Sequence, residues 1–247
     1  PPNVHGALKA AQIPASSVAV VVQPVDAGKP LVAHNAAQPM NPASVMKLVT
    51  TYAALDLLGP SYTWATPVFV DGPIRDGTLH GNLTIQGQGD PKLVLERMWL
   101  LLRRIQGLGI RNIAGDIVLD NSAFALPAAD PSAFDGEPLR PYNAAADALL
   151  INFKSVVMTF APEPGNTVAR VQFDPPLAGV HMQATVPLLG GECADYRGAL
   201  KADFSDPKAI RFAGGYAQSC GEKVWAVAYA DPKGYAMRAV QGMWQDI

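Results

Sequence analysis

The chain has 247 residues, a length that allows more than one domain. Hydrophobic residues make up 49% and charged residues 16%, so the chain can bury a sizeable core, which excludes a disordered protein. A net charge of −2 without a run of lysines or arginines excludes a typical nucleic-acid-binding protein. No apolar stretch reaches the roughly 20 residues of a membrane-spanning helix.

The N-terminal part of the chain has an α+β pattern. A short amphipathic helix is predicted over residues 3–12, followed by a β-branched strand at 17–23. A turn at 26–29 leads to a return strand at 31–34, so these two strands are expected to form a hairpin. The chain opens with Pro1 rather than Met and shows no signal peptide, which favours a processed or trimmed form.

Residues 41–60 read as one helix with its start and stop signals. Asn41 suits the N-cap, and Pro42 fits the first helical position, where its missing N–H costs nothing. Gly59 suits the left-handed residue after a helix, and Pro60 prevents continuation. Apolar residues occur nearly all round this helix, so we expect it to be buried.

A serine and a lysine three residues apart stand in the first turns of that helix. The spacing puts the Ser44 hydroxyl and the Lys47 amine on one face, within reach of each other. The free N–H groups of a helix start stabilise an anion, so Ser44 has the surroundings of a nucleophile. The alternative is a serine that helps capping and a lysine that extends to solvent. The same spacing recurs at Ser205 and Lys208 without a long helix, where Ser205 is interpreted as a turn residue.

The middle of the chain mixes strands with one amphipathic helix. That helix is predicted over residues 93–108, with a Pro-, Asp- and Ala-rich loop at 122–141. Strands are predicted at 66–70, 78–85 and 113–120.

An all-β region is expected to follow, and a helix at 235–244 closes the chain. The strands of this all-β region are predicted at 148–153, 155–160, 168–173, 181–186, 198–204 and 210–212, with a further strand at 224–230.

The chain has two cysteines and no CxxC motif. Cys193 and Cys220 flank a polar, Gly-rich segment, which favours a disulfide and an oxidising compartment over two free buried thiols. The four histidines are scattered without ligand spacing, and no zinc, P-loop or G-x-S-x-G motif occurs. No metal or cofactor is therefore expected.

Five stretches, in this order along the chain, resemble one known family. They are Pro42–Leu55 with its Ser-Val-Met-Lys, Gly87–Leu93, Ile113–Asp120, Arg140–Ala144 and Ala148–Asn152. The chain resembles the N-terminal part of penicillin-binding protein 4-type D-alanyl-D-alanine carboxypeptidases/endopeptidases, the class C low-molecular-mass penicillin-binding proteins. The cysteine pair also matches this family.

The resemblance implies an α+β fold. In the family, a β-lactamase/transpeptidase-like domain is interrupted after the Ser-x-x-Lys helix by a large insertion, a mixed α/β domain with a nested β-rich domain. Residues 1–64 would then be the N-terminal part of the transpeptidase domain. Residues 65–153 and 222–247 would form the mixed inserted domain, and residues 154–221 the nested β-rich domain.

The resemblance also assigns roles to the serine and the lysine. Ser44 matches the nucleophile that forms an acyl-enzyme with a peptidoglycan stem peptide or with penicillin, and Lys47 matches the general base. The Ser44 N–H would form half of an oxyanion hole. Asp135 lies where family members place an acidic residue facing the free amine of a diamino acid, with Glu137 as the competing residue.

One departure from the family is large. The Ser-x-Asn and Lys-Thr-Gly motifs are absent, and Lys233-Gly234 lacks the threonine. We therefore expect an N-terminal fragment, or one part of a longer or cleaved chain. A β-lactamase or esterase using the same pair remains an alternative, which the long insertion disfavours. A non-catalytic cell-wall-binding module is the second alternative.

The expected partners follow from the same resemblance. They are peptidoglycan stem peptides and β-lactam antibiotics, acted on by a serine D,D-peptidase with carboxypeptidase or endopeptidase activity in the periplasm. Peripheral membrane association and a homodimer are left open, whereas binding to nucleic acid is not expected.

Overall fold

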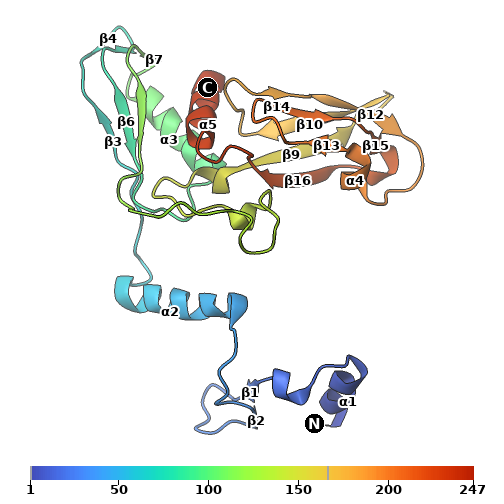
Figure 1. Ribbon diagram of the computed structural model, residues 1–247. Helices are drawn as coiled ribbons and strands as arrows, with labels where there is room; N and C mark the ends of the chain where they lie inside the picture. The colour runs from blue at the N-terminus through green and yellow to red at the C-terminus, as the bar shows by residue number, and fades with distance from the viewer. Residues whose placement is uncertain (1, 166) are drawn as a thin grey trace. The chain divides into compact units, whose positions relative to one another are not determined.

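The computed structural model describes residues 2–165 and 167–247. The chain divides into two compact units, Pro1–Thr63 and Trp64–Ile247. Together they contain helices and several small sheets, so the fold is of the mixed α/β type (Figure 1). Of the helices in the described part, none combines the length and the apolar character that a membrane crossing requires.

The first unit begins with helix α1 (Pro2–Ala10) and a 3₁₀ turn (Ala15–Ser17). Strands β1 (Val20–Val22) and β2 (Val32–His34) then pair antiparallel, so the expected hairpin is confirmed with shorter strands. The Asn35 side chain ties this hairpin to the preceding turn, because its Nδ2 donates to the carbonyls of Ala15 and Val18.

The long helix of this unit is α2 (Met46–Leu58), preceded by a 3₁₀ turn (Ala43–Val45). Its end signals act as expected, since Gly59 adopts a φ of +79° and donates its N–H to the Leu55 carbonyl. The expectation that the helix is buried is wrong for this chain, because α2 has no buried residue and Leu57 is 80% exposed. An all-round apolar helix needs cover on several sides, and the other elements of the first unit do not supply it.

The second unit opens with two three-stranded sheets. Strands β3 (Val68–Val70), β6 (Leu83–Gln86) and β8 (Ile117–Asp120) lie in the order β3-β6-β8. Strands β4 (Ile74–Arg75), β5 (Thr78–Leu79) and β7 (Asn112–Ile113) form the second sheet.

The stretches 78–85 and 113–120, each predicted as one strand, are split between these two sheets. The split falls at two glycines in close contact, since the Gly115 N–H donates to the Gly81 carbonyl over 3.2 Å. A Cβ on Gly115 would lie only 2.5 Å from that carbonyl oxygen, so this crossing requires glycine.

Two helices supply much of the core of this unit. Helix α3 (Leu95–Gly107) and helix α5 (Tyr235–Asp246) pack side by side (Figure 1). They correspond to the helices predicted at 93–108 and 235–244. Their buried side chains include Met98, Leu102, Ile105, Ala239, Val240 and Met243.

The predicted all-β region contains a five-stranded sheet in the order β15-β12-β10-β9-β16. Its strands are β9 (Ser155–Pro162), β10 (Val168–Asp174), β12 (Thr185–Leu189), β15 (Tyr216–Ala217) and β16 (Lys223–Ala228). A smaller sheet comprises β11 (His181–Met182), β13 (Ala202–Asp203) and β14 (Ala209–Phe212). Phe160 stacks on Tyr216 and meets Phe212 edge-on, which joins the two sheets in one core.

One predicted strand of this region is wrong, and another is wrong in its first part. The segment 148–153 leads into a 3₁₀ turn (Ile151–Lys154) in which Asn152, Phe153 and Lys154 all have positive φ. The Asn152 side chain supports this turn by donating to the Ser155 carbonyl. The segment 198–204 begins inside helix α4 (Tyr196–Leu200), at whose start the Asp195 carboxylate accepts the Gly198 N–H. Its second part contains strand β13 (Ala202–Asp203), as predicted.

One sheet contains strands from both sides of a predicted domain boundary. Strand β16 pairs with β9 over its whole length, so one sheet crosses the boundary expected between residues 221 and 222 (Figure 1). A strand that closes a sheet from a distant part of the chain is invisible to local patterns, because its pairing depends on tertiary contacts. The nested arrangement of domains stays a prediction.

A disulfide joins Cys193 and Cys220, the two residues that the sequence favoured as a pair. It connects the loop after β12 to the 3₁₀ turn before β16 (Gln218–Cys220), and Cys220 is buried.

Candidate active site

The serine and the lysine of the first unit are in direct contact. The Lys47 amine donates a hydrogen bond of 2.8 Å to the Ser44 hydroxyl oxygen. Ser44 lies in the 3₁₀ turn and Lys47 in the first turn of α2, so their separation of three residues brings both to one face. Both side chains are exposed, so a ligand can reach them.

The backbone before Ser44 has an unusual conformation. Ala43 has a φ of +42°, which costs free energy for a residue with a Cβ. The Asn41 carboxamide holds this conformation by accepting the Ala43 N–H over 2.9 Å, and the Val45 N–H donates to the Pro42 carbonyl. The turn therefore fixes where the Ser44 side chain leaves the helix start.

This arrangement can perform nucleophilic chemistry. A hydroxyl in contact with an amine can lose its proton to that amine when the amine is neutral, and its oxygen can then attack a carbonyl carbon. The start of a helix offers N–H groups and partial positive charge to the oxyanion that such an attack creates.

The acidic residue predicted from the resemblance belongs to the second unit. Asp135 is exposed and accepts three hydrogen bonds from neutral groups: the Tyr142 hydroxyl at 2.7 Å, the Asn143 amide at 2.7 Å and the Glu137 N–H at 3.0 Å. These bonds, led by that from Tyr142, hold the pKa of the Asp135 carboxyl below its usual range. The same bond raises the pKa of the Tyr142 hydroxyl.

The competing residue is engaged differently. The Glu137 carboxylate forms an ion pair with the Arg140 guanidinium, so its charge is already neutralised. No ion pair involves Asp135 within the described part of the chain. Of these two carboxylates, Asp135 is therefore the better partner for a ligand amine.

Tyr142 and Asn143 both donate hydrogen bonds to Asp135, although the sequence reasoning did not single them out. They lie in the stretch Arg140–Ala144, which carried part of the family resemblance. Hydrogen bonds to a remote carboxylate leave no periodic signal, so only the stretch itself could have marked them.

The second serine of a Ser-x-x-Lys spacing has no comparable lysine. The Ser205 hydroxyl donates to the Asp203 carboxylate over 2.7 Å, and the Ser205 N–H donates to the same oxygen. These bonds hold the pKa of Asp203 below its usual range, so this carboxylate is a weak base. Ser205 remains a turn residue.

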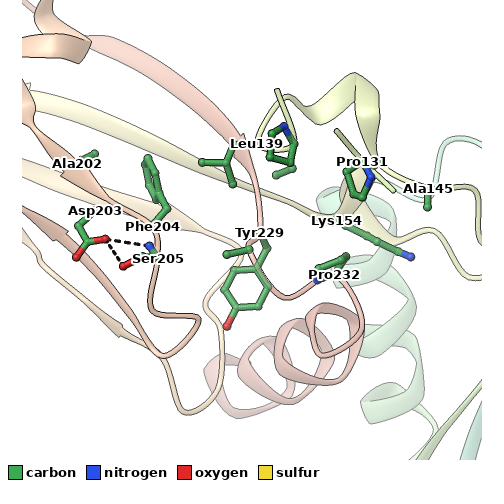
Figure 2. Close-up of a pocket in the computed structure, with 14 residues that line it drawn as sticks. Pro131, Leu139, Ala145, Lys154, Ala202, Asp203, Phe204, Ser205, Tyr229 and Pro232 are labelled. Atoms are coloured by element: carbon green, nitrogen blue, oxygen red, sulfur yellow. Dashed lines mark hydrogen bonds between the residues drawn. The ribbon is translucent and has the colours of Figure 1, made fainter. Parts of the chain in front are cut away.

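Ser205 also lines a cavity of about 500 Å³. Figure 2 shows Ser205 and Asp203 at one end of the cavity and Lys154 at the other, with prolines and alanines among the lining residues. The Lys154 amine is paired with the Asp147 carboxylate at 2.8 Å. The cavity therefore shows no activated nucleophile. No group of His, Cys, Asp or Glu side chains in the described part of the chain could hold a metal ion.

Comparison with known proteins places this geometry in context. The model of the D-Ala-D-Ala carboxypeptidase 3 (S13) family matches residues 2–246. The D-alanyl-D-alanine carboxypeptidase DacB of Haemophilus influenzae is 32% identical over 110 residues, which are 44% of this chain and 23% of that protein. A D-alanyl-D-alanine carboxypeptidase of Actinomadura sp. (strain R39) is 33% identical over 106 residues, 42% of this chain and 20% of that protein.

Solved structures show the same fold. Penicillin-binding protein 4 from Haemophilus influenzae superposes with a TM-score of 0.63 at 21% identity, over 92% of this chain and 50% of that one. A second structure of that protein, in complex with a β-lactam, gives a TM-score of 0.56 at 22% identity and covers 92% and 48%. The chain thus spans about half the length of the solved relatives it matches.

Proposed function

Because the chain belongs to the D-Ala-D-Ala carboxypeptidase 3 (S13) family, we propose that it acts as a serine D,D-peptidase on peptidoglycan stem peptides. The observation that carries this proposal is the contact between the Lys47 amine and the Ser44 hydroxyl at the start of α2. A hydroxyl and an amine on one face of a helix start supply a nucleophile, its base and an anion-stabilising end together.

The proposed reaction has two steps. In the first, the neutral Lys47 amine takes the hydroxyl proton while Ser44 Oγ attacks the carbonyl carbon between the two terminal D-alanines. The Ser44 N–H stabilises the oxyanion, and the intermediate collapses with transfer of a proton to the departing D-alanine amine. In the second step, water attacks the ester on Ser44 and releases the shortened peptide.

A β-lactam is the second proposed ligand of Ser44. Its strained amide would be attacked in the same way, but the opened ring remains attached and the ester is released slowly. A family relative has been solved in complex with a β-lactam, which supports this proposal.

Asp135 gives the proposal a specificity element. Its carboxylate, held charged by the Tyr142 hydroxyl, is suited to the free amine of a diamino acid in the stem peptide. Such a contact would also suit the cross-linked peptides that an endopeptidase cuts.

The exposed surface of α2 supports a longer functional unit. Leu48 is 71%, Tyr52 71% and Leu57 80% exposed, a pattern typical of a surface that another part of a protein covers. In this proposal that cover is the remainder of a transpeptidase domain, which carries the Ser-x-Asn and Lys-Thr-Gly motifs, and residues 65–247 form its insertion. The disulfide supports a periplasmic location, since disulfides persist in oxidising compartments.

Labelled penicillin tests this function. The chain, a form extended to the length of its solved relatives, and the Ser44→Ala variant of each are incubated with the drug and examined for a covalent adduct. A stable adduct on the extended form that is lost in Ser44→Ala supports the peptidase. Rapid turnover of the drug would indicate a β-lactamase instead, and no adduct on either form would indicate a non-catalytic cell-wall-binding module.

A further inference from the structure

One edge of the five-stranded sheet carries unpaired backbone groups. Strand β16 is the last strand of this sheet and pairs with β9 on one side only. The Ala228 N–H donates outward to the Leu139 carbonyl over 2.8 Å, and the Val224 carbonyl accepts the Tyr196 hydroxyl over 3.3 Å. Because backbone groups alternate sides along a strand, Ala226 also faces away from β9.

Ala226 is exposed, and no residue in 2–165 or 167–247 bonds to its N–H or its carbonyl. The Val224 N–H is likewise unbonded within these residues. The unbonded N–H and carbonyl of Ala226 thus lie between the engaged Val224 carbonyl and the engaged Ala228 N–H, and the unbonded Val224 N–H lies just beyond that carbonyl. An extended backbone can complement these groups, as a neighbouring strand does on the paired side of β16.

A groove runs along this row. Its volume is about 740 Å³, and its walls are residues 224–227 of β16, the loop 137–142 and the side chains of Arg197 and Phe204. The loop contacts β16 through the bond between Leu139 and Ala228, so the strand edge is already engaged at that end. A chain lying against Ala226 is therefore limited in length on one side.

A preorganised cation stands at the wall of this groove. The Arg197 guanidinium lies 5.5 Å from the centre of the Trp225 ring and 5.6 Å from that of Tyr196, and its Nε donates to the Tyr196 hydroxyl. Arg197 forms no ion pair in the part of the chain that the structure describes. Its two terminal nitrogens can therefore bind a carboxylate with little loss of side-chain freedom.

We propose that this groove binds an extended acidic segment of another protein, which adds to β16 as a strand and places a carboxylate on Arg197. An extended chain can form hydrogen bonds with the unpaired backbone groups of Val224 and Ala226. A negative charge on that chain can pair with the Arg197 guanidinium. The other arginine of the groove, Arg140, is already paired with Glu137, so the charge requirement falls on Arg197 alone. This inference is independent of the peptidase reaction.

The test uses short blocked peptides that alternate valine and threonine and carry one glutamate, moved through every position, with glutamine peptides as controls. Binding is measured by fluorescence anisotropy, and backbone amide hydrogen exchange is followed by NMR. We expect at least one glutamate peptide to bind and to slow exchange at Val224 and Ala226 by roughly tenfold at saturation. The Trp225 and Val227 amides, which face β9, serve as internal controls.

Two variants separate the charge from the backbone. Arg197→Gln should lower the affinity for the glutamate peptide roughly tenfold and leave the affinity for the glutamine peptide unchanged. Arg103→Gln is the matched control, because Arg103 also stacks on a tryptophan, Trp99, away from the groove. Ala226→Pro removes only an outward N–H, which an edge strand tolerates, and should abolish binding while thermal unfolding shows the fold retained.

Three results would overturn the proposal. The first is that no glutamate peptide alters exchange at Ala226. The second is protection of Ala226 by a D-alanine-terminated stem peptide alone, which would make the groove part of the substrate site. The third is protection that rises with protein concentration without peptide, which would identify a second copy of this chain as the occupant.

Discussion

The Lys47 amine donates its hydrogen bond to Ser44, whereas Lys208, at the same spacing from Ser205, has no such contact in the described part of the chain. The Ser205 hydroxyl instead donates to Asp203. One spacing thus yields a nucleophile-base pair in one place and a turn in the other. The difference lies in the helix that follows the first serine, because a continuous helix turns both side chains to one face.

This difference predicts the effect of substitutions on acylation. In the extended form, Ser44→Ala should abolish the penicillin adduct, and Lys47→Ala should slow its formation by roughly 10²- to 10⁴-fold, the range for a lost general base. The rate is measured with a fluorescent penicillin by stopped flow. Ser205→Ala and Lys208→Ala are the matched controls and should leave the rate unchanged. An undiminished rate in Lys47→Ala would assign the base to another group.

A second prediction concerns the amine of the stem peptide. Asp135→Asn should weaken the binding of a peptide with a free diamino-acid amine, because this amine carries a positive charge. The binding of a peptide whose amine is acetylated should stay unchanged. Both affinities are measured by calorimetry. Asp130→Asn is the control, since Asp130 lies in the same loop and its carboxyl is held by hydrogen bonds from Ser132. Equal losses for both peptides would point to a purely structural role of Asp135.

The lowered pKa of Asp135 leads to a third prediction. Its carboxylate is charged above this pKa, so any contact with an amine is present there and is lost as the pH falls through it. Tyr142→Phe removes the largest cause of the shift, so the Asp135 pKa should rise toward the ordinary value of an aspartate. Carboxyl carbon shifts of Asp135, recorded by NMR in both proteins, measure the change. An unaltered titration in Tyr142→Phe would show that the hydroxyl does not hold the carboxylate.

The disulfide provides a fourth prediction. Cys193 and Cys220 are separated by 27 positions, and closing a loop of that size stabilises the folded state by roughly 2–4 kcal/mol. The double variant Cys193→Ser, Cys220→Ser should lose that amount in denaturant unfolding of the second unit. Adding reductant should destabilise the parent chain to a similar extent and leave the variant unaffected. A thiol count that reductant does not change would show that the bond is not formed.

A matched pair of glycines gives a fifth prediction. Gly115→Ala should destabilise the second unit by about 1–3 kcal/mol, because its Cβ would press on the Gly81 carbonyl. Gly107→Ala, at the end of α3 where nothing lies within 4 Å of a Cβ, should be neutral or stabilise by up to about 1 kcal/mol. Thermal unfolding of the two variants measures both effects. Equal stabilities would contradict the close approach of the two glycine backbones.

Several features could be predicted from the sequence because their signals are local. The stop signals at Gly59 and Pro60, the hairpin, and the amphipathic pattern of α3 each depend on residues a few positions apart. The reach between Ser44 and Lys47 follows from helix geometry alone. The family could be recognised because its stretches keep their order along the chain.

The tertiary structure alone decided the rest. Strand β16 joins β9 from more than sixty positions away, and Tyr142 and Asn143 gather on Asp135 through a folded loop. The exposure of α2 could not be predicted from the sequence either. An apolar pattern indicates that a helix would be stabilised by burial, but it does not show which residues, if any, pack against it. The preference for a helix, strand or turn depends on neighbouring residues, whereas strand pairing and burial depend on contacts between residues far apart in the sequence.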